Sequence, residues 1–256
     1  MPVGKAPAAE PQVVRQHRLY STYVYMRLFV LSLLITAASS EAQTTPLHLD
    51  GHLLLPRTDT LAVYLVLGND TTRLGTVEDR LTVEGASLVR LYSEVLRDVV
   101  HFDTMVSVLS DLRPRSFRAR STVRTTQLVY DSTSIKGWIR EDGVLHSVNI
   151  SLSSPVYEGV NVDLIARASP LTHGLQLSIP AFVYGTRTIS TIRGGVIGEE
   201  DVEGHPCWIV RVEFPEFVGR PETPVTLWID RANRVLRRLF VQRAAAGGFL
   251  YLNQSP

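Results

Sequence analysis

The chain has 256 residues, of which 45% are hydrophobic and 20% are charged, and its formal net charge is +1. This length can bury a sizeable core in one large domain, or in two at most. Because positive and negative charges nearly balance, the composition gives no general electrostatic argument for nucleic acid or an anionic membrane as a partner.

The first element in chain order is a short apolar block at residues 28–38. It follows Met26 and Arg27 and ends in small residues that include Ala42. A positive charge, a short apolar block and a small-residue end predict a secretory signal peptide. The block is too short to span a bilayer, which needs about 20 apolar residues. We therefore expect a signal region at 1–42, cleavage after Ala42, no transmembrane segment in the mature chain, and export to the periplasm or cell envelope.

Two alternatives concern this N-terminal region. Residues 1–25 are either a long basic extension of the signal or lie ahead of the true start at Met26, which we favour because Met26 and Arg27 already complete a signal. A buried core helix of about 10–14 residues has the same appearance, but the N-terminal position favours export. Residues 43–256 contain no internal repeat or long linker, so we expect them to form a single β-rich domain.

Strand patterns dominate residues 43–256. Short β-branched and aliphatic runs are separated by Gly, Pro, Asn and Asp at close spacing. The predicted strands lie at 60–67, 81–83, 87–92, 99–109, 116–130, 135–139, 144–152, 175–184, 188–197, 207–214, 223–230 and 235–242. This spacing favours a mainly β fold, an antiparallel meander that forms an incomplete curved barrel.

One short helix is predicted at about 161–168, as a cover for the curved sheet. Val162, Ile165 and Ala166 have helical spacing, and Asn161 can cap the start. Residues 88–95 would also fit a helix, although the strand pattern there is stronger.

Cys207 is the only cysteine, so the chain has no internal disulfide. It is either a reactive or intermolecular thiol or a small core residue within a strand. The neighbouring Trp208 and Ile209 favour burial, since free cysteine is among the most buried residue types.

Two strands carry candidate binding residues. Arg118, Arg120 and Arg124 alternate with apolar residues over 116–124, which predicts one basic face that can bind an anionic group such as a lipid headgroup. The simpler interpretation is a solvated face whose arginines pair with acidic neighbours.

Trp208, Val210 and Val212 share one face of the strand at 207–214, and Trp228 lies on the next strand. They line either a packed core, which is the simpler interpretation, or an apolar ligand groove.

The sequence gives little support for catalysis. It contains no Gly-x-Ser-x-Gly motif and no helical His pair or Cys/His zinc pattern. His101 and Asp103 share a strand face that can hold a metal, but a solvated face is the simpler interpretation. We therefore expect a protein that is not an enzyme, with no catalytic residues, metal site or cofactor, and a hydrolase is the least favoured alternative.

Several motifs resemble the lipoprotein-carrier-like (Lol-type) proteins. Gly-His-Pro-Cys-Trp-Ile-Val-Arg-Val at 204–212, Thr-Leu-Trp-Ile-Asp-Arg at 226–231 and Arg-Val-Leu-Arg-Arg at 234–238 are similar to the end of these carriers. The segments 163–171 and 179–182 resemble the middle of an uncharacterised exported bacterial family with the same tail. The resemblance covers roughly 100–243 and implies a half-open barrel with helical cover, whose concave face holds acyl chains in the carriers, and no catalytic residues.

Together these observations predict an exported non-enzymatic protein that binds a hydrophobic or lipidic ligand in the concave face of a half-open barrel. Trp208, Val210, Val212 and Trp228 are the candidate ligand-binding residues. The alternative is an interaction or structural module of the envelope with a filled core. Its partner would be another envelope protein, bound at an edge strand or at the predicted basic face of Arg118, Arg120 and Arg124.

Overall fold

The computed structural model describes residues 47–255 except 98, 184–185, 215–222 and 244–246. The predicted signal region and the start at Met26 lie outside the described residues, so the boundary at residue 42 and the single-domain assignment stay predictions. Within the described part, no helix is long and apolar enough to cross a membrane.

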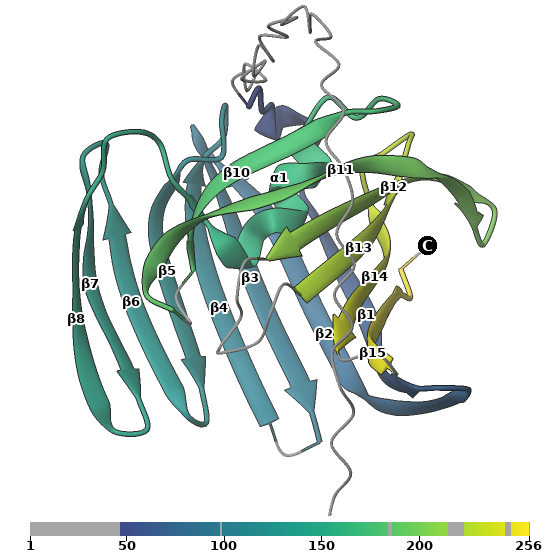
Figure 1. Ribbon diagram of the computed structural model, residues 1–256, viewed down its shortest axis with the longest axis horizontal. Helices are drawn as coiled ribbons and strands as arrows, with labels where there is room; N and C mark the ends of the chain where they lie inside the picture. The colour runs from purple at the N-terminus through teal and green to yellow at the C-terminus, as the bar shows by residue number, and fades with distance from the viewer. Residues whose placement is uncertain (1–46, 98, 184–185, 215–222, 244–246, 256) are drawn as a thin grey trace, which may run out of the picture. The chain divides into compact units, whose positions relative to one another are not determined.

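All strands of the described residues belong to one sheet (Figure 1). They are β1 (Arg57–Leu67), β2 (Asp70–Glu84), β3 (Ser87–Leu96), β4 (Val99–Val108), β5 (Pro114–Ser121), β6 (Arg124–Tyr130), β7 (Ser134–Glu141), β8 (Val144–Ser151), β9 (Tyr157–Glu158), β10 (Gln176–Val183), β11 (Thr188–Val202), β12 (His205–Phe214), β13 (Thr223–Asp230), β14 (Leu236–Arg243) and β15 (Gly247–Asn253). The order β8-β7-β6-β5-β4-β3-β2-β1-β15-β14-β13-β12-β11-β10-β9 joins two meanders through the antiparallel β1–β15 pair. Among the described strands, only β9 pairs in parallel, with β10. The order begins at β8 and ends at β9, so the barrel is incomplete and the predicted fold class is confirmed.

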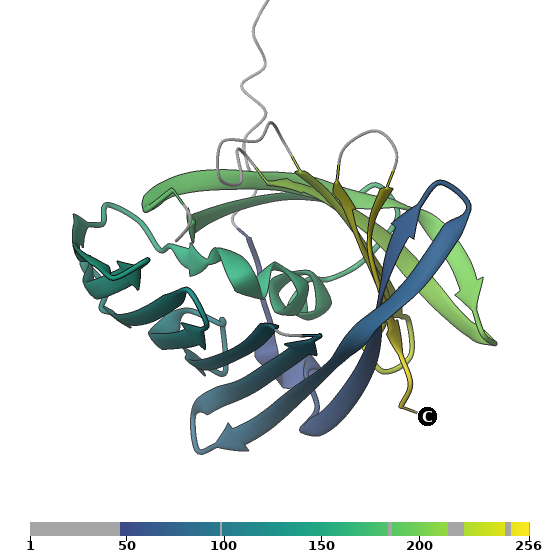
Figure 2. The same cartoon turned by 90° about the horizontal axis from the view of Figure 1, so that it is seen from below.

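The sheet curves around the short helix α1 (Val162–Ala168), as Figure 2 shows. Irregularities in register lie between Val63 and Tyr64, Val106 and Ser107, Val196 and Gly198, and Trp228 and Ile229. Such β-bulges bend strands and increase their twist. They therefore help the sheet to wrap around the helix.

The helix is confirmed close to its predicted position, but its start differs from the prediction. The Asn161 side chain makes no capping hydrogen bond; its Oδ1 instead accepts one from the Arg90 guanidinium at 2.9 Å. At the other end, the Ser169 hydroxyl donates to the Ile165 carbonyl at 2.8 Å. Two short 3-10 helices, η1 (Gly51–Leu53) and η2 (Gly159–Asn161), flank this core element.

Three strand predictions need correction. Residues 116–130 form two strands, because the chain turns at Thr122 and Val123. Residues 88–95 belong to β3 and are not helical. The first part of β2 and all of β15 were not predicted as strands. In β2 this is because polar residues such as Arg73 and Glu78 occupy its exposed positions, so the segment lacks the apolar run that marks a strand.

Candidate functional site

Trp208, Val210 and Val212 lie on the inner face of β12, in the core that surrounds α1. Val210 and Val212 are fully buried and Trp208 is 8% exposed. They belong to the same hydrophobic cluster as Leu164 and Ile165 of α1. These three candidate residues are therefore packed against protein.

Trp228 lies on the opposite, outer face of the sheet. Residues directly opposite each other on antiparallel strands share a face; Trp228 is opposite Ile209, whereas Trp208 is opposite Ile229. The Trp228 indole N–H donates to Glu200 at 2.6 Å, and the Arg238 guanidinium lies 5.0 Å from the ring centroid. The prediction that Trp228 lines the same core or cavity as Trp208 is wrong.

Polar side chains cover the edge of Trp208. The His173 ring meets the indole edge-to-face at a centroid distance of 5.0 Å, and the Arg231 guanidinium lies 4.6 Å from the ring centroid. Glu199 contacts both, with 2.6 Å between its Oε1 and the His173 Nε2, and forms an ion pair with Arg231. The Trp208 end of the concave face is therefore closed by this small polar cluster.

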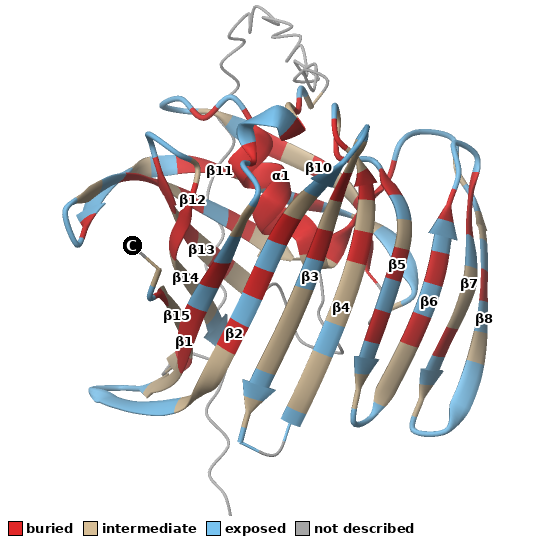
Figure 3. Cartoon of the chain, turned by 180° about the vertical axis from the view of Figure 1, so that it is seen from behind, coloured by how far each residue is buried: buried red, intermediate tan, exposed pale blue. Residues whose placement is uncertain are grey.

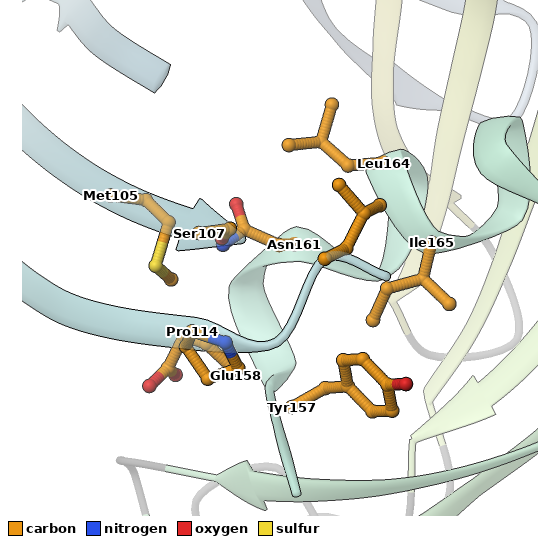
Figure 4. A pocket seen from close by; sticks show the side chains of 9 residues that line it. Met105, Ser107, Pro114, Tyr157, Glu158, Asn161, Leu164 and Ile165 are labelled. Carbon is orange, nitrogen blue, oxygen red and sulfur yellow. The ribbon is translucent and has the colours of Figure 1, made fainter. Parts of the chain in front are cut away.

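Helix α1 fills the concave face, and all of its residues are buried. Beside it lies a cavity of only about 10 Å³ (Figure 4). Its lining residues are Met105, Ser107, Leu112, Pro114, Tyr157, Glu158, Asn161, Leu164 and Ile165. This volume is about the smallest that can hold one water molecule.

A buried ion network joins α1 to the sheet. The Arg90 guanidinium on β3 donates to both carboxylate oxygens of Asp79 at 2.8 Å, and to both of Asp163 on α1 at 2.9 and 3.1 Å. Burial alone lowers the pKa of Arg90, but Asp163 and Asp79 outweigh burial and hold the pKa well above its usual value. Sequence reasoning missed this network, because its members lie far apart in the chain and form no local motif.

A second buried polar pair holds the short strand β9 against β6. The Tyr130 hydroxyl donates to the carboxylate of Glu158, which is 1% exposed. Burial raises the pKa of Glu158 to about 8, against a smaller opposing effect of the Tyr130 hydrogen bond. The carboxyl is therefore mostly protonated in the folded protein at neutral pH.

Partly buried hydrophobic side chains pack against the core that encloses α1, and we call six of them the rim. The rim residues are Tyr92, Leu96, Phe214, Leu239, Val241 and Tyr251. Glu94 accepts a hydrogen bond from the Tyr251 hydroxyl at 3.2 Å, and burial raises the pKa of the Glu94 carboxyl.

His101 and Asp103 lie on the inner face, since they are opposite Glu94 and Tyr92. They form an ion pair at 2.7 Å and are 22% and 13% exposed, so the predicted solvated face is wrong. Among the described residues, no group of three or more metal-ligating side chains surrounds them or any other site.

The three candidate arginines are divided between the two faces of the sheet. Arg118 and Arg120 are exposed on the outer face of β5, as predicted. Arg124 begins β6 on the inner face, where it is opposite Glu141 and forms an ion pair with it. The prediction of one basic face for all three is wrong, because the turn at 122–123 interrupts the alternation.

Cys207 is fully buried, as the sequence predicts. Burial raises the pKa of its thiol to about 11, and Asp230 adds to this effect. The thiol is therefore poorly suited to act as a nucleophile at neutral pH.

These features define a half-open, antiparallel β-barrel whose concave face is occupied by its own helix. The family described as a protein of unknown function (DUF3108) matches residues 68–252, so the chain belongs to this family. The predicted membership of an uncharacterised family is thereby confirmed.

Comparisons with individual proteins add two solved structures. The chain is similar to a β-barrel-like protein of the domain of unknown function DUF1849 from Brucella abortus, with a TM-score of 0.49 and 10% identity over 78% of this chain and 96% of that one. It is also similar to a LolA superfamily protein from Nitrosomonas europaea, with a TM-score of 0.23 and 11% identity over 80% of this chain and 88% of that one. No curated protein matches the chain.

Proposed function

We propose that this chain is an exported, non-enzymatic interaction module of the cell envelope with a filled core. The observation that carries the proposal is the position of α1, which is buried throughout and occupies the concave face. Sites for small molecules and cofactors typically have volumes of about 300–1,000 Å³. The cavity beside α1, at about 10 Å³, is far below this range.

The attachment of α1 also supports the proposal. Asp163 on the helix shares the Arg90 guanidinium with Asp79 on the sheet, and all three side chains are buried. Separating such a network leaves uncompensated buried charge, which costs about 3–5 kcal/mol. A ligand that displaced α1 would have to supply this free energy in addition to the lost apolar packing.

A lipidic ligand at the concave face is the second candidate, and the apolar rim favours it. Tyr92, Leu96, Phe214, Val241 and Tyr251 are only partly buried, although their apolar side chains pack against the core. An acyl chain that bound there would bury apolar area without displacing α1.

Native mass spectrometry separates the two candidates. The protein is delipidated, incubated with extracted envelope lipids and measured again. The interaction module predicts no adduct that depends on the rim, whereas one retained lipid per chain that is lost in Val241→Asp would support the second candidate. The variant Val241→Asp provides the control, because it should abolish an adduct at the rim but leave unspecific adducts unchanged.

Export is tested on the same preparation. N-terminal sequencing of protein from the periplasmic fraction should begin at Gln43. A chain that begins at Met1 would contradict the predicted cleavage.

A further inference from the structure

The outer face of β4–β8 carries basic side chains and, within the described residues, no carboxylate. The cross-strand register places Arg120 opposite Phe102 and Thr125, and Arg140 opposite Thr125. Arg118 lies opposite Thr104 and Gln127, and Lys136 lies opposite Val129. We call the set Arg118, Arg120, Lys136 and Arg140 the basic outer face. Figure 3 views this side of the sheet.

These cations are not neutralised by the protein. Arg140 lies 5.8 Å from the centroid of the Trp138 ring, and none of the four forms an ion pair among the described residues. The outer face of β11–β14 differs, because carboxylates lie among its cations: Glu200 forms an ion pair with Arg238 at 3.3 Å, and Glu213 forms one with Arg211 at 3.8 Å. The basic outer face therefore lacks the carboxylates that accompany the cations on the outer face of β11–β14.

Exposed apolar side chains lie among the cations and on the adjoining strand β3. They are Leu91, Val95, Phe102, Val129 and Leu145, with exposed fractions between 41% and 58%. Phe102 and Trp138 also line an open hollow of about 230 Å³ together with Arg118 and Arg120. Contiguous apolar surface with a polar surround marks an interaction site on many proteins.

We propose that this face docks onto the surface of an anionic phospholipid membrane. Unpaired Arg and Lys are attracted to anionic headgroups, and aromatic side chains favour the headgroup level. A surface spread over several strands, with one shallow hollow, suits the plane of a bilayer better than the contour of a single protein partner. The inference names the partner of the interaction module and thus rests on the proposed function.

Vesicle co-sedimentation of the full chain tests the proposal. Phosphatidylcholine vesicles with and without phosphatidylglycerol are compared for the wild type and for the double variant Arg118→Glu/Arg120→Glu. The matched control is Arg193→Glu/Arg211→Glu, which changes the net charge equally at exposed positions of β11 and β12. Because residues 1–46 are the same in all variants, any binding that they contribute cancels in the comparison.

The wild type should bind the vesicles that contain phosphatidylglycerol more tightly. Each basic side chain near an anionic surface contributes about fivefold to binding, so the Arg118/Arg120 variant should bind at least about 25-fold more weakly, while the control stays near the wild type. Phe102→Ser, at an exposed position, should weaken binding to the same vesicles without affecting folding.

Three results would overturn the proposal: no binding to anionic vesicles, equal binding to both vesicle types, or equal losses in the two charge variants. The third result would mean that net charge, and not this face, governs binding. None of them affects the mass-spectrometric test of the filled core, so failure of the membrane face and failure of the proposed function are distinguishable.

Discussion

Replacing Glu158 by glutamine should remove a large part of the pH dependence of stability. Burial raises the pKa of this carboxyl from 4.5 to about 8 in the folded state. Between these values the folded protein holds a proton that the unfolded chain has released, so stability falls as pH rises through this window. At about 1.4 kcal/mol per pH unit, the shift of about 3.5 units gives an upper limit of about 5 kcal/mol.

Urea unfolding between about pH 5 and pH 8 measures this effect. The free energy of unfolding of the wild type should fall by several kcal/mol more than that of Glu158→Gln, because the amide does not ionise. Burial lowers the pKa of His101, but Asp103 outweighs burial and raises it. The protonated His101 therefore stabilises the folded protein, and this stability is also lost as pH rises through the folded pKa of His101. Both proteins share this decline, so their difference isolates Glu158. Exposed Glu84→Gln is the control, and parallel profiles for the wild type and Glu158→Gln would refute the reasoning.

Three further predictions concern the interior. Arg90→Ala should lower the free energy of unfolding by about 3–5 kcal/mol, because it leaves two buried carboxylates without their partner. Leu164→Ala should cost about 2–5 kcal/mol through lost burial and a new cavity beside α1. Cys207 should react with a thiol reagent at about pH 8 only as fast as the protein unfolds, since its pKa is about 11 and its side chain is buried.

Each of these three predictions has a control variant or a result that would contradict it. Arg80→Ala, exposed on the neighbouring strand, should change the urea midpoint little, and an equal loss at both arginines would contradict the role of the network. An unchanged midpoint for Leu164→Ala would show that α1 is not packed as described. Mass spectrometry follows the labelling of Cys207, and labelling faster than global unfolding would contradict the burial of this thiol.

The meander and the single helix were predictable because their signals are local. Alternating apolar residues and Gly- or Asp-containing turns mark most strands, and helical spacing marks 162–166. The faces were harder to assign, because one unrecognised turn at 122–123 moved Arg124 to the other side of the sheet. Likewise, the register that separates Trp208 from Trp228 depends on the pairing of whole strands.

The features that support the proposed function were less accessible from sequence. Arg90 meets Asp79 and Asp163 across 11 and 73 residues of chain, and such pairings leave no spacing pattern. The sequence predicts that α1 covers the curved sheet, but it does not reveal that the helix lies within the concave face and fills it. The basic outer face was only partly visible, because Lys136 and Arg140 join Arg118 and Arg120 through strand pairing.

Hydrogen exchange of the α1 amides tests the filled core most directly. If α1 is a permanent part of the core, the amides of Val162–Ala168 should exchange only through global unfolding, like those of the central strands β1 and β13. Added envelope lipids should then leave the rates of α1 unchanged relative to those of the strands. Rapid exchange of α1 while these strands stay protected, or a change in the exchange of α1 that the strands do not share when lipids are added, would contradict a filled concave face.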